Sequence, residues 1–425
     1  MNEKSLDKSQ LRIGMFVLLD LPWMSHPFLT NSFKIRNRRQ LNILRQLDIE
    51  QVRVDLDRSD VFTEEDIEDT AAEETIDSNG ESQDDLKSTL WAEKNERILR
   101  LKQRRSRLNQ CAKSYVQKVG LARKLMAHLR SSPAQAAVEA AELVDGMVGD
   151  LTEDAETTVQ LVNLKHQDEN SYNHAINVSA LALVLGRKLG LDEGQLRLLG
   201  QGGLFHDLGH LKIPAQILMK KGPLTEPERR FYEQHPRYGA EIARQISTLP
   251  VGVIEIIAKH HEYLDGSGYP EGLRANDLGL LTRILTVVNR YDNLCNGFGG
   301  ERGLSPHQAV SRMYSKERQC YDPKVLTTFI TNLGVYPPGT VVKLNDERIA
   351  VVISINADDL LKPNVLVYSD EIPAEEALVL DLIEEGIGIG ESLHRSDLTQ
   401  TQIEYLNLSD KLSYYFQGSR GGSSR

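Results

Sequence analysis

Histidines are concentrated in one stretch of the chain, since seven of the 11 lie between His166 and His261. The stretch contains the adjacent pair His206-Asp207. Imidazoles and carboxylates together suit divalent cations such as iron, manganese or zinc, and the stretch has no cysteine to form a thiolate site. A carboxylate beside an imidazole can bridge two cations while the imidazole binds one. The pattern predicts a metal centre, although a single His-Asp pair is more often a helix end or a surface pair.

Composition and charge limit the other functional classes. The three cysteines are widely spaced and odd in number, which argues against a disulfide framework. The net charge of -11 argues against a nucleic-acid binder, because affinity for a phosphate backbone comes from clustered Lys and Arg. An anionic substrate would need local positive charge, which a metal centre can supply. We find no apolar run that could span a bilayer or act as a secretory signal, and therefore expect a cytoplasmic protein without a membrane span.

The histidine-rich stretch lies within a region of helical periodicity, residues 133–333. Apolar residues recur at helical spacing in four segments, 136–151, 174–189, 226–247 and 250–259. After Gly334 the pattern changes to short apolar runs with a turn at Asn345-Asp346. This change predicts a C-terminal β appendage over residues 334–417, followed by a disordered tail, 418–425, that is rich in Gly and Ser.

Three segments precede the helical region. Residues 1–57 contain short apolar stretches and prolines, which predict a small β or α+β module. We expect this module to regulate or localise the protein without contributing chemistry. Residues 58–90 are acidic and poor in aromatic residues, as expected of a disordered linker. Residues 91–132 are rich in helix formers and predict a long connecting helix. Because the histidine-rich stretch lies after Pro133, a chain starting there should keep its metal, provided that this helix does not cover the core.

The segment from His260 to Pro270, HHEYLDGSGYP, matches the HHExxDGxGYP signature of the HD-GYP family, a subset of the HD-domain phosphohydrolases. Companion motifs follow in the family's order: His174 in a helix, HDLGHLKIP around His206, Lys220 before GPLT, His235-Pro236, RYDNL and YDP. The resemblance covers roughly residues 150 to 333. It implies a mainly α protein, an HD-domain helical bundle, and both flanking modules look like those of one HD-GYP subgroup.

The resemblance also implies the site and its activity. Its metal ligands would be His174, His206, Asp207, His235, His260 and His261, with Asn289 at the position of a further ligand. Asp207 would bridge two divalent ions, iron or manganese, and a metal-activated hydroxide would hydrolyse cyclic di-GMP to pGpG and onward to GMP. The catalytic residues would be His206, Asp207 and His210, and the substrate-binding residues Asp265, Gly266, Gly268, Tyr269 and Pro270. A signalling role, protein partners and a homodimer are further expectations.

The chain departs from the family pattern at several positions. His210 stands where a lysine is usual, and Asn289 replaces an aspartate that binds the first metal. Asn170 occupies the position of a glutamate found in members with three ions. These departures leave two alternatives open: a catalytically weakened sensor or scaffold that binds nucleotide or a partner, and a phosphodiesterase or nucleotidase with another substrate.

Overall fold

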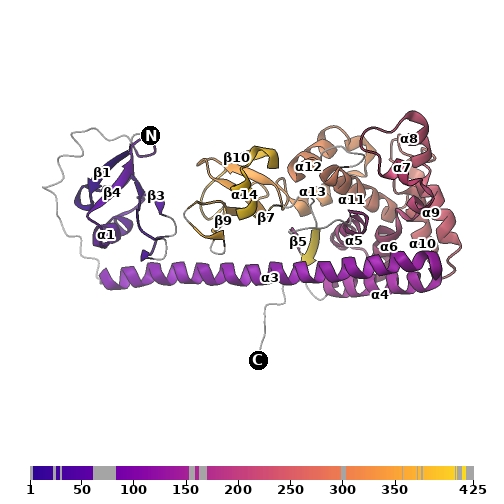
Figure 1. Ribbon diagram of the computed structural model, residues 1–425, viewed down its shortest axis with the longest axis horizontal. Coiled ribbons are helices and arrows are strands. Elements are labelled where there is room, and N and C mark those ends of the chain that lie inside the picture. Colours follow the sequence, from indigo (N-terminus) through magenta and orange to yellow (C-terminus); the bar gives the residue numbers. More distant parts are fainter. Residues whose placement is uncertain are drawn as a thin grey trace, which may run out of the picture. The chain divides into compact units, whose positions relative to one another are not determined.

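The computed structural model divides into two compact units (Figure 1). The first contains Met1–Arg104 and Ser369–Ala377, and the second contains Arg105–Tyr368 and Leu378–Arg425. The residues that the structure describes are 3–22, 25–28, 31–60, 83–152, 158–161, 170–297, 303–356, 358–370, 372–374, 377–406, 408 and 414–417. Most of the acidic segment and the predicted tail therefore lie outside the described residues.

The N-terminal module is a four-stranded antiparallel sheet with one helix, in the strand order β1-β4-β2-β3. Its elements are β1 (Glu3–Asp7), β2 (Phe16–Leu18), β3 (Ser32–Lys34), α1 (Arg38–Gln46) and β4 (Gln51–Asp55). Alternation along β4 buries Val52 and Val54 and exposes Gln51 and Arg53, which places one face of the strand in the module's core. The α+β character expected for this module is confirmed.

Helix α3 (Gln83–Ser131) is longer than the connecting helix that we expected. It begins inside the segment 58–90, because the sequence after Gln83 continues in helix formers without a proline until Pro133. Its C-terminal half contributes Tyr115, Val119, Ala122, Leu125 and Leu129 to the main hydrophobic core. This half is therefore part of the helical domain, and the condition that we attached to a chain starting at Pro133 is not met.

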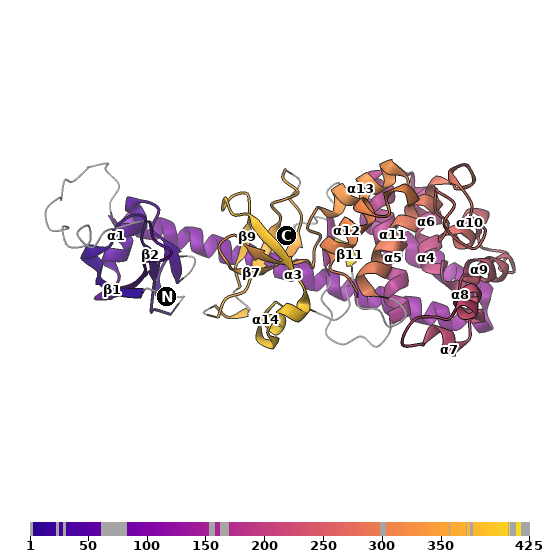
Figure 2. The same cartoon turned by 90° about the horizontal axis from the view of Figure 1, so that it is seen from above.

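The helical domain is built around α5, which packs against α6 and α11, while α6 also packs against α4 and α10 (Figure 2). Its helices are α4 (Pro133–Thr152), α5 (Asn170–Lys188), α6 (Glu193–Phe205), α7 (Ala215–Leu218), α8 (Glu226–Tyr232), α9 (His235–Arg244), α10 (Val251–Lys259), α11 (Leu280–Asn296), α12 (Pro306–Ser315) and α13 (Pro323–Leu333), with the 3-10 turn η3 (Leu208–Lys212). The single helix expected over 226–247 is in fact α8 and α9. Pro236 causes the break, because proline is tolerated only in the first turn of a helix.

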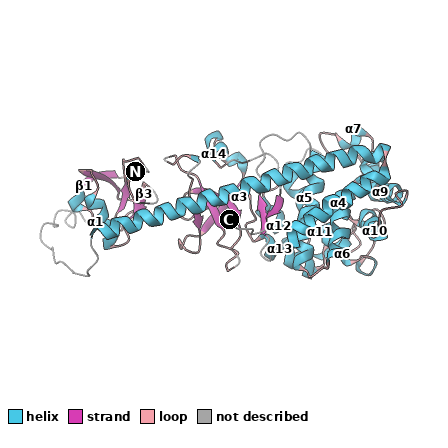
Figure 3. Cartoon of the chain, turned by 90° about the horizontal axis from the view of Figure 1, so that it is seen from below, coloured by secondary structure: helices cyan, strands magenta, loops and turns pink. Residues whose placement is uncertain are grey.

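The C-terminal region forms a five-stranded antiparallel sheet in the order β10-β6-β7-β8-β9 (Figure 3, strands in magenta). Its elements are β6 (Val341–Leu344), β7 (Ile349–Ser354), β8 (Asn364–Val367), β9 (Val379–Asp381), β10 (Ile389–Leu393) and α14 (Gln400–Tyr405). The last described strand, β11 (Tyr414–Gln417), instead pairs with β5 (Thr158–Leu161) of the helical domain. Within the described residues, no helix is both long enough and apolar enough to cross a membrane.

Candidate metal centre

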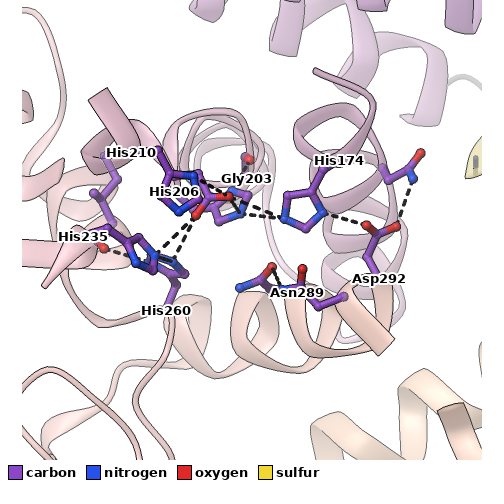
Figure 4. Close-up of polar contacts among 12 residues, drawn as sticks. His174, Gly203, His206, His210, His235, His260, Asn289 and Asp292 are labelled. Atoms are coloured by element: carbon purple, nitrogen blue, oxygen red, sulfur yellow. Dashed lines mark hydrogen bonds and ion pairs between the residues drawn. The ribbon is translucent and has the colours of Figure 1, made fainter. Parts of the chain in front are cut away.

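Four helices bring the predicted metal ligands to one place (Figure 4). His174 comes from α5, His206 and Asp207 follow the end of α6, His235 begins α9, and His260 and His261 follow α10. They form two groups whose ligand atoms lie within 4.8 Å of one another: His174, His206 and Asp207, and Asp207, His235, His260 and His261. Asp207 belongs to both groups, so the structure brings together two adjacent candidate cation sites that share one carboxylate.

Two glycines allow the backbones that carry these residues to approach each other. A Cβ atom on Gly203 would lie 2.8 Å from the Cα of Ser179, so glycine permits the close contact of α6 with α5. A Cβ atom on Gly209 would lie 1.8 Å from the backbone oxygen of His235, so glycine permits the contact of η3 with α9. Both glycines lie within a few residues of Asp207, which explains how this carboxylate reaches histidines from both sides.

Backbone hydrogen bonds fix the tautomers of three histidines. In His206, His235 and His260 the Nδ1 atom lies 2.8, 2.9 and 2.8 Å from the carbonyl oxygen of the residue three positions earlier. A carbonyl oxygen only accepts hydrogen bonds, so each Nδ1 carries the proton and donates it. Each Nε2 then has a lone pair available for a cation, the usual arrangement around metal-binding histidines.

The Nε2 atoms face each other in two pairs. His174 and His206 have their Nε2 atoms 3.0 Å apart, and those of His235 and His260 are 3.2 Å apart. Two lone pairs at this distance repel each other unless a cation, or a second proton on one ring, lies between them. Burial lowers the pKa of His260 to about 3, which disfavours a second proton there at neutral pH. The pair of His235 and His260 therefore fits a divalent cation.

Asp207 presents one oxygen to each histidine pair. Its Oδ1 lies 3.4 Å from His235 Nε2 and 3.8 Å from His260 Nε2. Its Oδ2 lies 3.4 Å from His206 Nε2 and 3.8 Å from His174 Nε2. Burial favours the neutral acid, but the surrounding imidazoles outweigh it and hold the pKa of Asp207 well below its usual value. An ionised carboxylate in this position can bridge two cations.

Asp292, in the motif RYDNL, supports the site by a contact that we did not predict from the sequence. It is fully buried on α11, and its Oδ2 accepts a hydrogen bond from His174 Nδ1 at 2.6 Å. Its Oδ1 accepts from the side-chain amide of Asn177 at 2.9 Å. Although burial opposes a charged imidazole, the carboxylates of Asp292 and Asp207 raise the pKa of His174. Asp292 thus orients His174 in the way that backbone carbonyls orient the other histidines.

Two of the three departures from the family pattern, Asn289 and His210, lie at this site. Asn289 is buried one helical turn before Asp292, and its amide oxygen accepts a hydrogen bond from Asn293 at 2.9 Å. His210 has its Nδ1 3.5 Å from Asp207 Oδ2, and burial lowers its pKa to about 4. Both residues are therefore neutral at neutral pH, whereas the usual aspartate and lysine would be charged.

The loop after His261 is held close to the centre. The rings of His261 and Tyr269 stack with centroids 4.5 Å apart. A Cβ atom on Gly268 would lie 2.5 Å from the backbone oxygen of His261, so only glycine fits. Glu262 is buried and accepts hydrogen bonds from the backbone N–H groups of Glu271 and Leu273 at 2.7 and 2.8 Å. It fixes both ends of the loop. We did not predict this role from the sequence.

Asp265 occupies a turn within this loop. Its Oδ1 accepts hydrogen bonds from the backbone N–H of Ser267 at 3.0 Å and from its hydroxyl at 2.7 Å. Gly266 has a φ of 83°, a left-handed conformation that favours glycine. The loop therefore has a defined shape, and the prediction that Asp265 binds substrate stays open.

Comparisons with known proteins identify two family models on this chain. An HD domain model matches residues 156–325, and a domain of unknown function, DUF3391, matches residues 3–140. The cyclic di-GMP phosphodiesterase PA4108 of Pseudomonas aeruginosa is 31% identical over 86% of this chain and 85% of its own length. The cyclic di-GMP phosphodiesterase response regulator RpfG of Xanthomonas campestris is 30% identical over 39% of this chain and 44% of its own length.

Two further proteins are similar over part or most of the chain. The 3'3'-cGAMP-specific phosphodiesterase 1 of Vibrio cholerae is 34% identical over 39% of this chain and 38% of its own length. The solved structure of Bd1817 from Bdellovibrio bacteriovorus covers 77% of this chain and 98% of its own, with a TM-score of 0.45 and 16% identity. The long match to PA4108, together with the HD domain model and the signature from His260 to Pro270, shows that the chain belongs to the HD-GYP group of the HD-domain family.

Proposed function

We propose that this chain hydrolyses the 3′,5′ phosphodiester of cyclic di-GMP, with pGpG as the first product, at a centre that holds two divalent cations. The observation that carries the proposal is the position of Asp207, whose two oxygens face different pairs of histidines. The three curated relatives described above are named as phosphodiesterases of cyclic dinucleotides. The relative that matches most of this chain is named for cyclic di-GMP, which supports that substrate.

In this proposal, His174 and His206 would hold one cation, His235, His260 and His261 would hold the other, and Asp207 would contribute one oxygen to each. Bound there, two cations supply water activation and offset the negative charge of the phosphate oxygens. The chain's own contribution is orientation, because the hydrogen bonds at each Nδ1 direct each Nε2 inward before any cation arrives. Neutral imidazoles are the metal-binding form, and the lowered pKa values of His260 and His261 keep these two rings neutral.

The loop that carries Tyr269 is proposed as one wall of the substrate site. Its glycines allow close approach of the backbone, and Tyr269 offers an aromatic ring that can contact a base. Its stacking on His261 would place that base beside the second cation. His210, next to Asp207, is proposed to contact the phosphate as a neutral hydrogen-bond donor instead of the usual cationic lysine.

The weakened sensor is the less favoured alternative, because the relatives that match this chain are named as enzymes. Asn289 and His210 predict a slower reaction or weaker metal binding, but neither residue predicts that the activity is lost. Iron or manganese as the metal, GMP as the end product, a cytoplasmic location, protein partners and a homodimer stay predictions.

The test is to load the full chain with manganese or iron, incubate it with cyclic di-GMP, and separate the products by chromatography. We expect pGpG to accumulate first, and 3'3'-cGAMP to be hydrolysed more slowly at equal concentration. Asp207→Asn should abolish product formation, whereas Asp358→Asn, at an exposed position of the β appendage, should not change it. Bound metal without any product would instead support the sensor.

A further inference from the structure

Tyr115 is linked to the metal centre by a buried series of hydrogen bonds. Its hydroxyl donates to Asn177 Oδ1 at 3.0 Å, Asn177 Nδ2 donates to Asp292 Oδ1 at 2.9 Å, and Asp292 Oδ2 accepts from His174 Nδ1 at 2.6 Å. Tyr115, Asn177 and Asp292 are at most 1% exposed. Three helices that are distant in sequence, α3, α5 and α11, therefore share one hydrogen-bond network that ends on a predicted metal ligand.

We propose that Tyr115 is a positioning residue of this centre, which orients His174 for its cation through Asn177 and Asp292. Tyr115 lies in the part of the chain that matches the domain of unknown function (residues 3–140), outside the HD domain match (residues 156–325). The proposal rests on the proposed metal centre and extends it, because it assigns part of the centre's support to a helix from the preceding family segment.

The physical basis is the asymmetry of the Asn177 side chain. An amide has one accepting oxygen and one donating NH2 group, and the two ends are nearly equal in shape. The Tyr115 hydroxyl favours the orientation in which the oxygen faces α3 and the NH2 group faces Asp292. In the reversed orientation the amide oxygen would face the carboxylate of Asp292, so two acceptors would meet in a buried place.

Asp292 needs that donor to hold His174. Its two oxygens accept from Asn177 and from His174, and the carboxylate is fully buried. Loss of the Asn177 donor leaves one oxygen without this partner, which favours a shift of the carboxylate away from its present position. His174 Nδ1 is hydrogen-bonded to that carboxylate, so a shift of the carboxylate would turn the imidazole ring of His174. The His174 Nε2 atom would then no longer point toward His206 as it does now.

The effect should be confined to one cation site. His235 and His260 are oriented by backbone carbonyls of their own segments, and neither contacts Asp292 in the hydrogen bonds described. A loss of general stability would weaken both sites, whereas a loss of His174 orientation weakens the site that contains His174 and His206. This difference separates positioning from a merely structural role.

The experiment is a titration of the metal-free full chain with Mn2+, followed by calorimetry and by the electron paramagnetic resonance signal of free Mn2+. Tyr115→Phe removes one oxygen and should weaken one of two sites by roughly three- to tenfold, with the other site within twofold of its original affinity. Asn177→Ala keeps the Tyr115 ring and should weaken the same site by about 10- to 100-fold, the range for residues that orient a ligating histidine.

The matched control is Tyr321→Phe, which removes another buried tyrosine hydroxyl that donates to Glu317 at 2.8 Å. It should leave both Mn2+ affinities within twofold. The double variant Tyr115→Phe with Asn177→Ala should bind Mn2+ no more weakly than Asn177→Ala alone, because the two residues act in series.

Unchanged Mn2+ binding by folded Tyr115→Phe, equal weakening of both sites, or additive effects in the double variant would overturn the proposal. Tyr115→Phe is replaced in this test if circular dichroism shows that it does not fold. In that case, an Asn177→Ala variant that binds Mn2+ at both sites with unchanged affinity would overturn the proposal. A full chain that binds no Mn2+ before any substitution would instead refute the metal centre itself.

Discussion

Gly209→Ala should remove one cation site while leaving the other in place. The added Cβ would lie 1.8 Å from the backbone oxygen of His235 and 2.7 Å from the backbone nitrogen of Gly239. A Cβ atom essentially never lies within 3.0 Å of another residue's atom in proteins, so η3 and α9 must separate by more than about 1 Å. Both neighbours are backbone atoms, which cannot move aside by a change of rotamer.

This separation acts on the side of Asp207 that faces His235. The Oδ1 atom lies 3.4 Å from His235 Nε2, and a shared cation needs both atoms at about 2.0–2.2 Å from it, within about 0.2 Å. A shift of about 1 Å exceeds that tolerance several times. His174 lies on α5 and His206 directly follows α6, and neither residue takes part in this contact, so their site should persist.

The assay is the number of Mn2+ ions bound per chain, measured after gel filtration. We expect two ions in the unaltered chain and one in Gly209→Ala, with a destabilisation of about 1–3 kcal/mol in urea unfolding. Gly146→Ala is the matched control, since a Cβ there meets no atom within 4 Å and alanine favours a helix. Two ions of unaltered affinity in Gly209→Ala would refute the reasoning from this contact.

Three further predictions concern other parts of the centre. Asn289→Asp should raise the Mn2+ affinity and the hydrolysis rate, because it restores a charged ligand beside His174, and a fall in both would show that the site has adapted to the amide. Glu262→Gln should raise KM for cyclic di-GMP with unchanged Mn2+ binding, since one of its two loop N–H groups loses its acceptor; a KM equal to that of the unaltered chain would contradict this role. In the folded, metal-free chain His260 has a pKa of about 3, whereas a histidine in the unfolded chain has a pKa of about 6.5. Below about pH 6.5 the unfolded state therefore binds more protons than the folded state does. The contribution of His260 to the free energy of unfolding should therefore decrease by about 2 kcal/mol from pH 7 to pH 5, and equal urea midpoints at the two pH values in the chelator-treated chain would refute it.

The local pattern of the sequence was sufficient for the family and for most elements. The segment HHEYLDGSGYP has many fixed positions within a few residues, and helical or alternating periodicity depends on neighbours along the chain. The helical core, the N-terminal α+β module and the strands β6, β7 and β8 were therefore predictable. The break between α8 and α9 was also visible in principle, because Pro236 marks it.

The residues that support the site could not be found in this way. Asp292 lies 118 positions from His174, and Asn177 lies 62 positions from Tyr115, so only the packing of α3, α5 and α11 makes them partners. The same holds for β11, whose pairing with β5 joins the end of the described chain to the helical domain. The sequence determined which side chains could bind a cation, because chemistry and short spacing identify them. The tertiary structure alone decided which buried donors and acceptors orient those side chains, because hydrogen bonds between distant segments leave no periodic signal in the sequence.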